Sequence, residues 1–380
     1  MADLSVPDLE SLESTLGGLD GKRILVRCDF NVPVRGGAIS DDLRIKATLP
    51  TLNWLMERGA IVVACTHFGR PQGAPDPKFS VQLLRQKVEE LAPGVELIEN
   101  LRFDPGETDN APEFVKYLVG GAGGDPFDGY VNDAFGVSHR THASIVGPPA
   151  SLPSAAGRLL EKEVDVLTRM RSAADRPFVA VLGGAKVSDK LGVIEALLGV
   201  VDRLLIGGGM CFTFLKALGH SVGDSLCETD QEQTCRRILD SGAPILLPSD
   251  ITALSPDGDI GGDNGEVRQM GPSMPEGWTG LDIGPGTAAA FEDVIHEARS
   301  VFWNGPMGMF EDPRFAAGTR AVGQALADTK AFTVVGGGDS AAAVAEMGLT
   351  PYMDHISTGG GASLELLELG DLPGLIALRN

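Results

Sequence analysis

Short runs of apolar residues, each about as long as a β-strand, recur along the chain. Most of them contain no alternating polar positions, which is typical of parallel strands buried on both faces. They occupy residues 24–26, 60–65, 95–98, 129–131, 178–182, 203–206, 244–247, 300–303 and 332–335. The pattern therefore predicts parallel sheets in both halves of the chain.

Segments with helical spacing lie between these runs, at residues 47–58, 81–91, 159–173, 191–200 and 340–347. Such alternation of strand and helix predicts an α/β fold with doubly wound, Rossmann-like parallel sheets. The alternation breaks between about residues 145 and 177, where three prolines precede a long helical pattern. A chain of 380 residues can build two cores. We therefore predict two domains, residues 1–158 and 176–364, joined by a hinge helix at residues 159–175.

One segment of the second half departs from this pattern. Residues 257–266 are acidic and glycine-rich, and they contain no apolar run that could enter a core. This composition predicts a surface hairpin or loop.

The formal net charge of −21 limits the possible partners. Nucleic acids and anionic membranes repel such a surface, so we expect neither as a partner. A locally basic cleft could still bind an anionic substrate. Acidic residues are abundant and lysine is scarce, which indicates adaptation to high salt, where repulsion is screened. An ordinary acidic enzyme is the alternative.

The sequence shows neither a signal peptide nor a transmembrane segment. Its first residues lack the basic and apolar segments of a signal peptide. No stretch approaches the roughly 18 consecutive apolar residues that are needed to cross a bilayer. We therefore expect a cytoplasmic protein.

Glycines follow the apolar runs of the second half. Gly183 and Gly184 begin a loop that ends at Lys190, between a strand and a helix, so its N–H groups would face an anion. Neither the Walker A spacing nor the dinucleotide fingerprint is present. A structural turn is the alternative, but Lys186 and Lys190 in so lysine-poor a chain favour a phosphate loop.

Two further glycine runs suggest the same chemistry. Residues 359–361 precede a helix, and their N–H groups would converge on a transferring phosphoryl group; a flexible turn is the alternative. Asp339 follows glycines 336–338 at the end of a strand, where its carboxylate could hold Mg²⁺. A helix N-cap is the alternative for Asp339.

Arginine and histidine take the corresponding places in the first half. They bind small, highly charged anions, and Asp29 and Asn31 beside them could bind hydroxyl groups. The set comprises Arg27, Arg44, His67, Arg70, Arg102, His139, Arg140 and His142. Two halves with two chemistries suggest an enzyme that carries a phosphoryl group across a cleft.

These motifs, taken together, resemble the phosphoglycerate kinase family, in order and spacing, from about Lys22 to Asn380. They lie at residues 27–33, 41–45, 67–71, 99–103, 132–136, 139–142, 183–190, 302–311, 336–340 and 357–363. The resemblance implies two doubly wound domains, with a C-terminal tail at residues 365–380 that returns to the first domain. It also implies reversible phosphoryl transfer from 1,3-bisphosphoglycerate to Mg-ADP, giving 3-phosphoglycerate and Mg-ATP. The transfer would be direct and in line, after hinge closure.

The resemblance also assigns roles to individual residues. The phosphoglycerate site would comprise Asp29, Asn31, Arg44, His67, Arg70, Arg102 and Arg140. The nucleotide site would comprise Lys186, Lys190, Gly207, Gly208, Asn304, Glu311, Gly337, Gly338, Asp339 and Ser340. Glu311 would bind the ribose and Asp339 the Mg²⁺, while Arg44, Lys186, Gly360 and Gly361 would act on the transferring group. The expected partners are these small molecules alone, and the expected state is a monomer.

Two other readings remain open on the residues alone. A dinucleotide-dependent dehydrogenase would require a G-x-G-x-x-G motif after a strand, and none is present. A non-catalytic, two-lobed anion-binding protein would explain the arginines. It would leave Lys186, Asp339 and Glu311 without a role.

Overall fold

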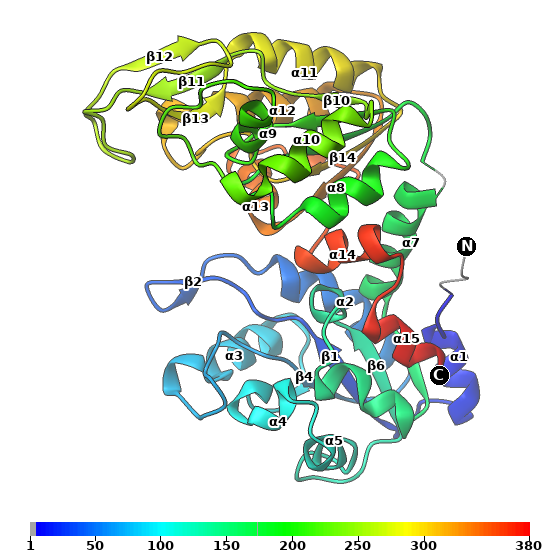
Figure 1. Ribbon diagram of the computed structural model, residues 1–380. Helices are drawn as coiled ribbons and strands as arrows, with labels where there is room; N and C mark the ends of the chain where they lie inside the picture. Colours follow the sequence, from blue (N-terminus) through cyan, green and yellow to red (C-terminus); the bar gives the residue numbers. More distant parts are fainter. Residues whose placement is uncertain (1–4, 173) are drawn as a thin grey trace. The chain divides into compact units, whose positions relative to one another are not determined.

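The computed structural model describes residues 5–172 and 174–380 (Figure 1). The described residues form two compact units. The first extends to Val166 and also includes Gly370–Asn380, while the second is Leu167–Leu369. The boundary falls within α7 (Arg158–Ser172). The start of the predicted first domain and position 173 of the predicted hinge helix lie outside the described residues.

A five-stranded parallel sheet forms the centre of the first unit, in the order β5-β4-β1-β6-β7. The strands are β1 (Arg23–Cys28), β4 (Ile61–Cys65), β5 (Glu96–Leu97), β6 (Gly129–Asp133) and β7 (Ser154–Ala156). In register, Arg27 of β1 lies beside Cys65 of β4 and Asn132 of β6. The segments that follow these three strands therefore leave the sheet at the same edge.

Helices surround this sheet, and local sequence accounts for several of their starts. Asp8 caps α1 by accepting a hydrogen bond from Ser11 N at 2.7 Å, and proline begins α4, α5 and α15. The helices are α1 (Leu9–Leu16), α2 (Leu43–Met56), α3 (Gln82–Leu91), α4 (Pro105–Thr108), α5 (Pro112–Val119), α6 (Ala143–Val146) and α15 (Pro373–Arg379). A small hairpin, β2 (Val34–Arg35) and β3 (Ala38–Ile39), precedes α2.

A six-stranded parallel sheet forms the centre of the second unit, in the order β10-β9-β8-β14-β15-β16. The strands are β8 (Phe178–Leu182), β9 (Arg203–Ile206), β10 (Ile245–Leu246), β14 (Ser300–Asn304), β15 (Phe332–Gly336) and β16 (His355–Ile356). From β8 the chain first adds β9 and β10 on one side of the sheet, and it then adds β14, β15 and β16 on the other side. In such sheets ligands bind beyond the carboxyl ends of the strands at this reversal point, here between β8 and β14.

The second unit also contains a three-stranded antiparallel sheet, in the order β12-β11-β13, which lies at one end of the unit in Figure 1. Its strands are β11 (Ile251–Leu254), β12 (Val267–Met270) and β13 (Thr279–Ile283). The predicted surface loop at residues 257–266 joins β11 to β12, so that prediction is confirmed. The helices are α8 (Leu191–Leu198), α9 (Cys211–Ala217), α10 (Glu232–Asp240), α11 (Pro285–Glu297), α12 (Ala317–Asp328), α13 (Gly338–Glu346) and α14 (Gly361–Leu369).

Each unit has its own apolar core, and the predicted doubly wound α/β fold is confirmed. Ile24 and Val26 of β1 are fully buried in the first core, as are Val181 of β8 and Trp303 of β14 in the second. Among the described residues, no helix is long and apolar enough to span a membrane.

Candidate active site

The loops that leave β8, β9 and β14 are joined to one another by backbone hydrogen bonds. Gly183 N donates to Asn304 O and Gly184 N donates to Pro306 O, both at 3.0 Å. Gly208 N donates to Met307 O at the same distance. Three loops that are distant in sequence therefore form one layer at the carboxyl edge of the second sheet.

Glycine permits this layer because the loops approach too closely for side chains. A Cβ atom on Gly183 would lie 2.1 Å from Pro306 O, and one on Gly208 would lie 2.6 Å from Gly184 N. Gly208 also has φ +64°, in the region that favours glycine. The glycines are thus required for packing between the loops.

This packing corrects one prediction from the sequence. The N–H groups of Gly183 and Gly184 were expected to face an anion, but they bond to backbone carbonyl groups of the β14 loop. Farther along the same loop, Ser188 N donates to Glu228 at 3.0 Å and Lys190 N donates to Val187 O at 2.9 Å. These four N–H groups are therefore already bonded within the protein and do not face an anion.

Lys190 and Asn304, both predicted to bind nucleotide, contact each other. Lys190 Nζ donates to Asn304 O at 3.1 Å and also to the side-chain oxygen of Asn304. Burial lowers the pKa of the Lys190 ammonium group to about 8, against the opposing effect of Asp339. The side-chain nitrogen of Asn304 is buried and has no hydrogen-bond partner.

A hollow of ≈ 460 Å³ lies beside the glycine loops. Three residues of the predicted nucleotide site line it, namely Gly208, Glu311 and Asp339. The other lining residues are Gly184, Ala185, Gly209, Asp224, Leu226, Ile260, Thr279, Gly280, Leu281, Pro306, Gly308 and Met309. Carboxylates and apolar side chains therefore share this hollow, which we call the glycine-loop pocket.

The apolar lining residues were not predicted from the sequence. Leu226, Ile260 and Met309 expose 47%, 50% and 40% of their surface, although each is a large apolar residue. Three such side chains around one hollow form an apolar surface suited to a flat ligand. Ile260 comes from the 257–266 loop, whose sequence predicts only a surface hairpin or loop.

Other predicted nucleotide-site residues lie outside the lining of the glycine-loop pocket. Lys186 is exposed on the loop after β8. Ser340 is buried, and its hydroxyl accepts a hydrogen bond from Gly305 N at 2.6 Å. Gly207 packs against Met307: a Cβ atom there would lie 2.6 Å from the Met307 sulfur atom.

Gly337, Gly338 and Asp339 form the start of α13. Gly337 is its N-cap residue, with φ +91°, and Gly338 is its first residue. Asp339 lies exposed in the first turn, so the alternative that Asp339 itself caps the helix is wrong.

Asp339 fits a particular kind of metal site. Among the residues that the structure describes, no three His, Cys, Asp or Glu side chains gather as metal ligands. A lone exposed carboxylate instead suits Mg²⁺ that arrives with a nucleotide and keeps phosphate oxygens and waters as its other ligands.

Gly360 and Gly361 lie at the start of α14. Gly359 is buried and donates from its N–H to Ser357 Oγ at 3.1 Å, while Ala362 N donates back to Gly359 O. Gly360 has φ +47°, and Gly361 is exposed. The two glycines predicted to act on a phosphoryl group are therefore more accessible than Gly359.

A second hollow, of ≈ 730 Å³, lies at the carboxyl edge of the first sheet and is called the arginine basin here. Five residues of the predicted phosphoglycerate site line it, namely Asn31, His67, Arg70, Arg102 and Arg140. The other lining residues are Gly69, Gln72, Gly73, Pro105, Thr108, Val137, His139 and His142. Arg70 and Arg140 are exposed.

Two predicted residues of this site pair with each other and do not line the basin. Arg44 donates from a terminal guanidinium nitrogen to Asp29 Oδ2 at 2.6 Å. Within the basin, Asn31 Oδ1 accepts a hydrogen bond from Gly69 N at 2.9 Å, and Arg102 donates to Gly69 O at 3.0 Å. Asn31 and Arg102 therefore hold the turn between His67 and Arg70.

Arginines supply the positive charge of the basin at neutral pH. Burial, together with the charge of neighbouring arginines, lowers the pKa of His139 and of His142 to about 4. Burial likewise holds the pKa of His67 well below its usual value. Arg102 Nε, His139 Nδ1 and His142 Nδ1 are buried without hydrogen-bond partners. Polar atoms that are buried and unpaired are costly unless a ligand or water binds them.

Arg27, at the end of β1, is fully buried among polar groups near the basin. It donates to Ser144 Oγ at 2.8 Å and lies 3.3 Å from His67 Nδ1. Glu107, also fully buried, lies 4.0 Å from the Arg27 guanidinium group. Arg27 therefore does not line the basin, but it contacts His67, which does.

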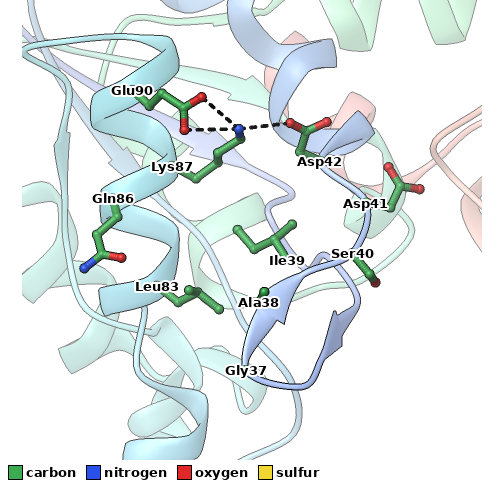
Figure 2. Close-up of a pocket in the computed structure, with 10 residues that line it drawn as sticks. All are labelled: Gly37, Ala38, Ile39, Ser40, Asp41, Asp42, Leu83, Gln86, Lys87 and Glu90. Carbon is green, nitrogen blue, oxygen red and sulfur yellow. Dashed lines mark hydrogen bonds and ion pairs between the residues drawn. The ribbon is translucent and has the colours of Figure 1, made fainter.

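A third hollow, of ≈ 560 Å³, lies between α3 and the β2–β3 hairpin, and Figure 2 shows its lining residues. None of the predicted site residues lines it. Lys87 of α3 contacts Asp42 at 3.3 Å and Glu90 at 3.1 Å (Figure 2). Asp42 directly precedes α2, so the ion pair joins α3 to the start of the helix that carries Arg44.

Comparison with known proteins identifies what this chain is similar to. The phosphoglycerate kinase family model matches residues 15–96 and 83–369. A phosphoglycerate kinase of Rubrobacter xylanophilus is 50% identical, over 98% of this chain and 97% of that protein. A phosphoglycerate kinase of Salinispora arenicola is 52% identical, over 95% of this chain and 96% of that protein.

A solved structure has the same fold. The structure of phosphoglycerate kinase from Coxiella burnetii superimposes with a TM-score of 0.85 at 34% sequence identity. The match covers 99% of both chains.

Proposed function

The chain belongs to the phosphoglycerate kinase family of phosphotransferases with a carboxyl group as acceptor, and from that premise we propose how its residues divide the reaction. The arginine basin binds 3-phosphoglycerate or 1,3-bisphosphoglycerate. The glycine-loop pocket binds ADP or ATP. Phosphate passes directly between the two substrates in a reversible transfer that serves glycolysis in one direction and gluconeogenesis in the other.

The unpaired polar atoms of the arginine basin are the observation that carries this proposal. Arg102 Nε and the Nδ1 atoms of His139 and His142 are buried without hydrogen-bond partners, beside the exposed Arg70 and Arg140. A small dianion would bond such atoms and neutralise the guanidinium charges. Phosphoglycerate carries a phosphate and a carboxylate that could bind to this set.

The glycine-loop pocket supports the nucleotide half of the proposal. Ile260, Leu226 and Met309 offer apolar surface to a base, and Glu311 offers a carboxylate that can accept from ribose hydroxyls. Asp339 would hold Mg²⁺, which neutralises phosphate charge when it is bound with the nucleotide. Lys186 and Lys190 would bind the phosphates by charge.

Direct transfer requires positioning and electrostatic stabilisation and no covalent enzyme intermediate. We assign Arg44 and Lys186 to the oxygens of the transferring group, with the N–H groups of Gly360 and Gly361. Substrates held on separate units must approach one another, so we also propose closure about a hinge at residues 159–175. A small-angle scattering profile that stays unchanged when both substrates are added would reject closure.

The test of the function is a coupled assay of 3-phosphoglycerate-dependent ATP consumption with Mg²⁺. We expect activity in the unmodified protein, and a loss of kcat of roughly 10²-fold in Arg44→Ala and in Lys186→Ala, as lost electrostatic donors cause. Arg299→Ala and Lys330→Ala are the controls, because these exposed cations precede β14 and β15, at the opposite edge of the sheet. An inactive folded protein would reject the function.

Two further expectations remain part of the proposal. A glycolytic role is consistent with a cytoplasmic location, and phosphate transfer between two units of one chain requires no second copy. Light scattering coupled to gel filtration tests the monomer directly, and a dimer mass would reject it.

A further inference from the structure

One ion pair holds the 257–266 loop in place. The Arg314 guanidinium group contacts Asp312 through Nε at 3.0 Å to Oδ1 and through a terminal nitrogen at 2.7 Å to Oδ2. The two side chains are only 21% and 5% exposed. Arg314 also keeps the pKa of Asp312 well below its usual value, so the pair remains ionised at ordinary pH.

The same pair binds the backbone on both sides of Ile260. Arg314 donates to Asp259 O at 2.6 Å, and Gly261 N donates to Asp312 Oδ2 at 3.0 Å. Arg314 additionally donates to Asn264 O at 2.9 Å, farther along the loop. The peptide groups that flank Ile260 are thus held by the two partners of a single ion pair.

Ile260 is the loop residue that lines the glycine-loop pocket, and half of its surface is exposed. Exposure of so much apolar surface is unfavourable unless a ligand covers it. Glu311, on the same pocket, directly precedes Asp312 in the chain. The ion pair therefore connects the apolar wall of the pocket to the segment that carries its carboxylate.

We propose that Asp312 and Arg314 are positioning residues for nucleotide binding, which hold Ile260 against the nucleoside and in fixed relation to Glu311. The proposal rests on the proposed function of the glycine-loop pocket. Neither residue touches the transferring phosphate, so the pair acts on nucleotide affinity and leaves the chemical step unchanged. An interaction that contributes equally before and in the transition state changes KM without changing kcat.

The experiment compares KM for ATP, KM for 3-phosphoglycerate and kcat in the full-length protein and in Arg314→Met. We expect KM for ATP to rise roughly ten-fold, with kcat and the other KM within about two-fold, since only uniform binding is lost. Arg314→Lys should restore part of the affinity, because its ammonium group reaches fewer acceptors than the guanidinium fork.

Arg268→Met is the matched control. Arg268 lies on β12 of the same hairpin and pairs with Glu266, but its side chain is 54% exposed and the pair does not bind the peptide groups beside Ile260. We expect its kinetic constants to equal those of the unmodified protein. An equal rise of KM for ATP in this control would reject a specific role for Arg314.

Ile260→Ser provides a second test if Arg314→Met proves unfolded by circular dichroism. This change removes the apolar contact and leaves the ion pair in place, so KM for ATP should again rise alone. An unchanged KM for ATP in Ile260→Ser, or a parallel change of all three constants in folded Arg314→Met, would overturn the proposal. Failure of the proposed function is recognised separately, as absence of phosphoryl transfer in the unmodified protein.

Discussion

The ammonium group of Lys190 lies 3.1 Å from the main-chain oxygen of Asn304, across the two glycine loops that follow β8 and β14. This places a titratable cation inside the loop layer, where burial lowers its pKa to about 8. A lysine with a lowered pKa is protonated below pH 8 and loses its charge as the pH rises through that value.

Nucleotide binding should follow this titration. We expect kcat/KM for ATP, which reports the free enzyme, to fall as the pH rises above about 8. In Lys190→Arg the cation persists to much higher pH, so the alkaline decline should disappear. Identical profiles for the two proteins would show that another group causes the decline.

Gly183 is predicted to tolerate no side chain. Gly183→Ala places a Cβ atom 2.1 Å from Pro306 O, and the resulting overpacking should lower the free energy of unfolding by about 1–3 kcal/mol. Urea denaturation measures this change. Gly338→Ala is the control, because no atom lies within 4 Å of a Cβ atom there. Equal stability of the two variants would contradict close packing of the loops.

Replacement of Asn31 should change KM for 3-phosphoglycerate and leave KM for ATP unchanged. Asn31→Ala removes the acceptor for Gly69 N, and we expect KM for 3-phosphoglycerate to rise roughly five-fold, since a lost hydrogen bond contributes about 1 kcal/mol. Asn31→Asp keeps an acceptor but adds negative charge beside an anion, so its KM should rise further. A matching rise of KM for ATP would point to general loosening of the protein.

Salt should stabilise this protein. With a net charge of −21, self-repulsion opposes the folded state until ions screen it, and the screening length falls from about 10 Å at 0.1 M to about 3 Å at 1 M. We expect the melting temperature to rise by roughly 4 °C or more between low and molar KCl, equivalent to at least about 1 kcal/mol. Tetramethylammonium chloride separates screening from binding of potassium. A melting temperature that stays constant or falls with KCl concentration would reject the hypothesis of salt adaptation.

Sequence patterns predicted the central strands well because burial on both faces leaves a continuous apolar run. The run at 178–182 coincides with β8, and the run at 300–303 lies within β14. The antiparallel sheet was not predicted, because β12 is largely exposed and carries no such run. β12 and β13 are recognisable only through their pairing with β11.

The glycine loops show where sequence reasoning fails for the site. Gly183 signalled a place of close approach, and a phosphate was the expected neighbour. The neighbour is the backbone of the β14 loop, whose Asn304 is far away in the sequence. Hydrogen-bond partners that are so far apart in the sequence leave no local sequence pattern. Nor does any local pattern show that Ile260, in a polar loop, lines a pocket.

The first unit depends on residues that follow the whole of the second. Gly370–Asn380 belong to it, and Gly374 N donates to Ser138 O at 2.8 Å. A Cβ atom on Gly374 would lie 2.9 Å from Ile145, so α15 is closely packed there. During translation the ribosome delivers α15 last, after every residue of the second unit. The first unit therefore cannot complete its packing until the whole second unit has been synthesised, although most of its own residues are synthesised first.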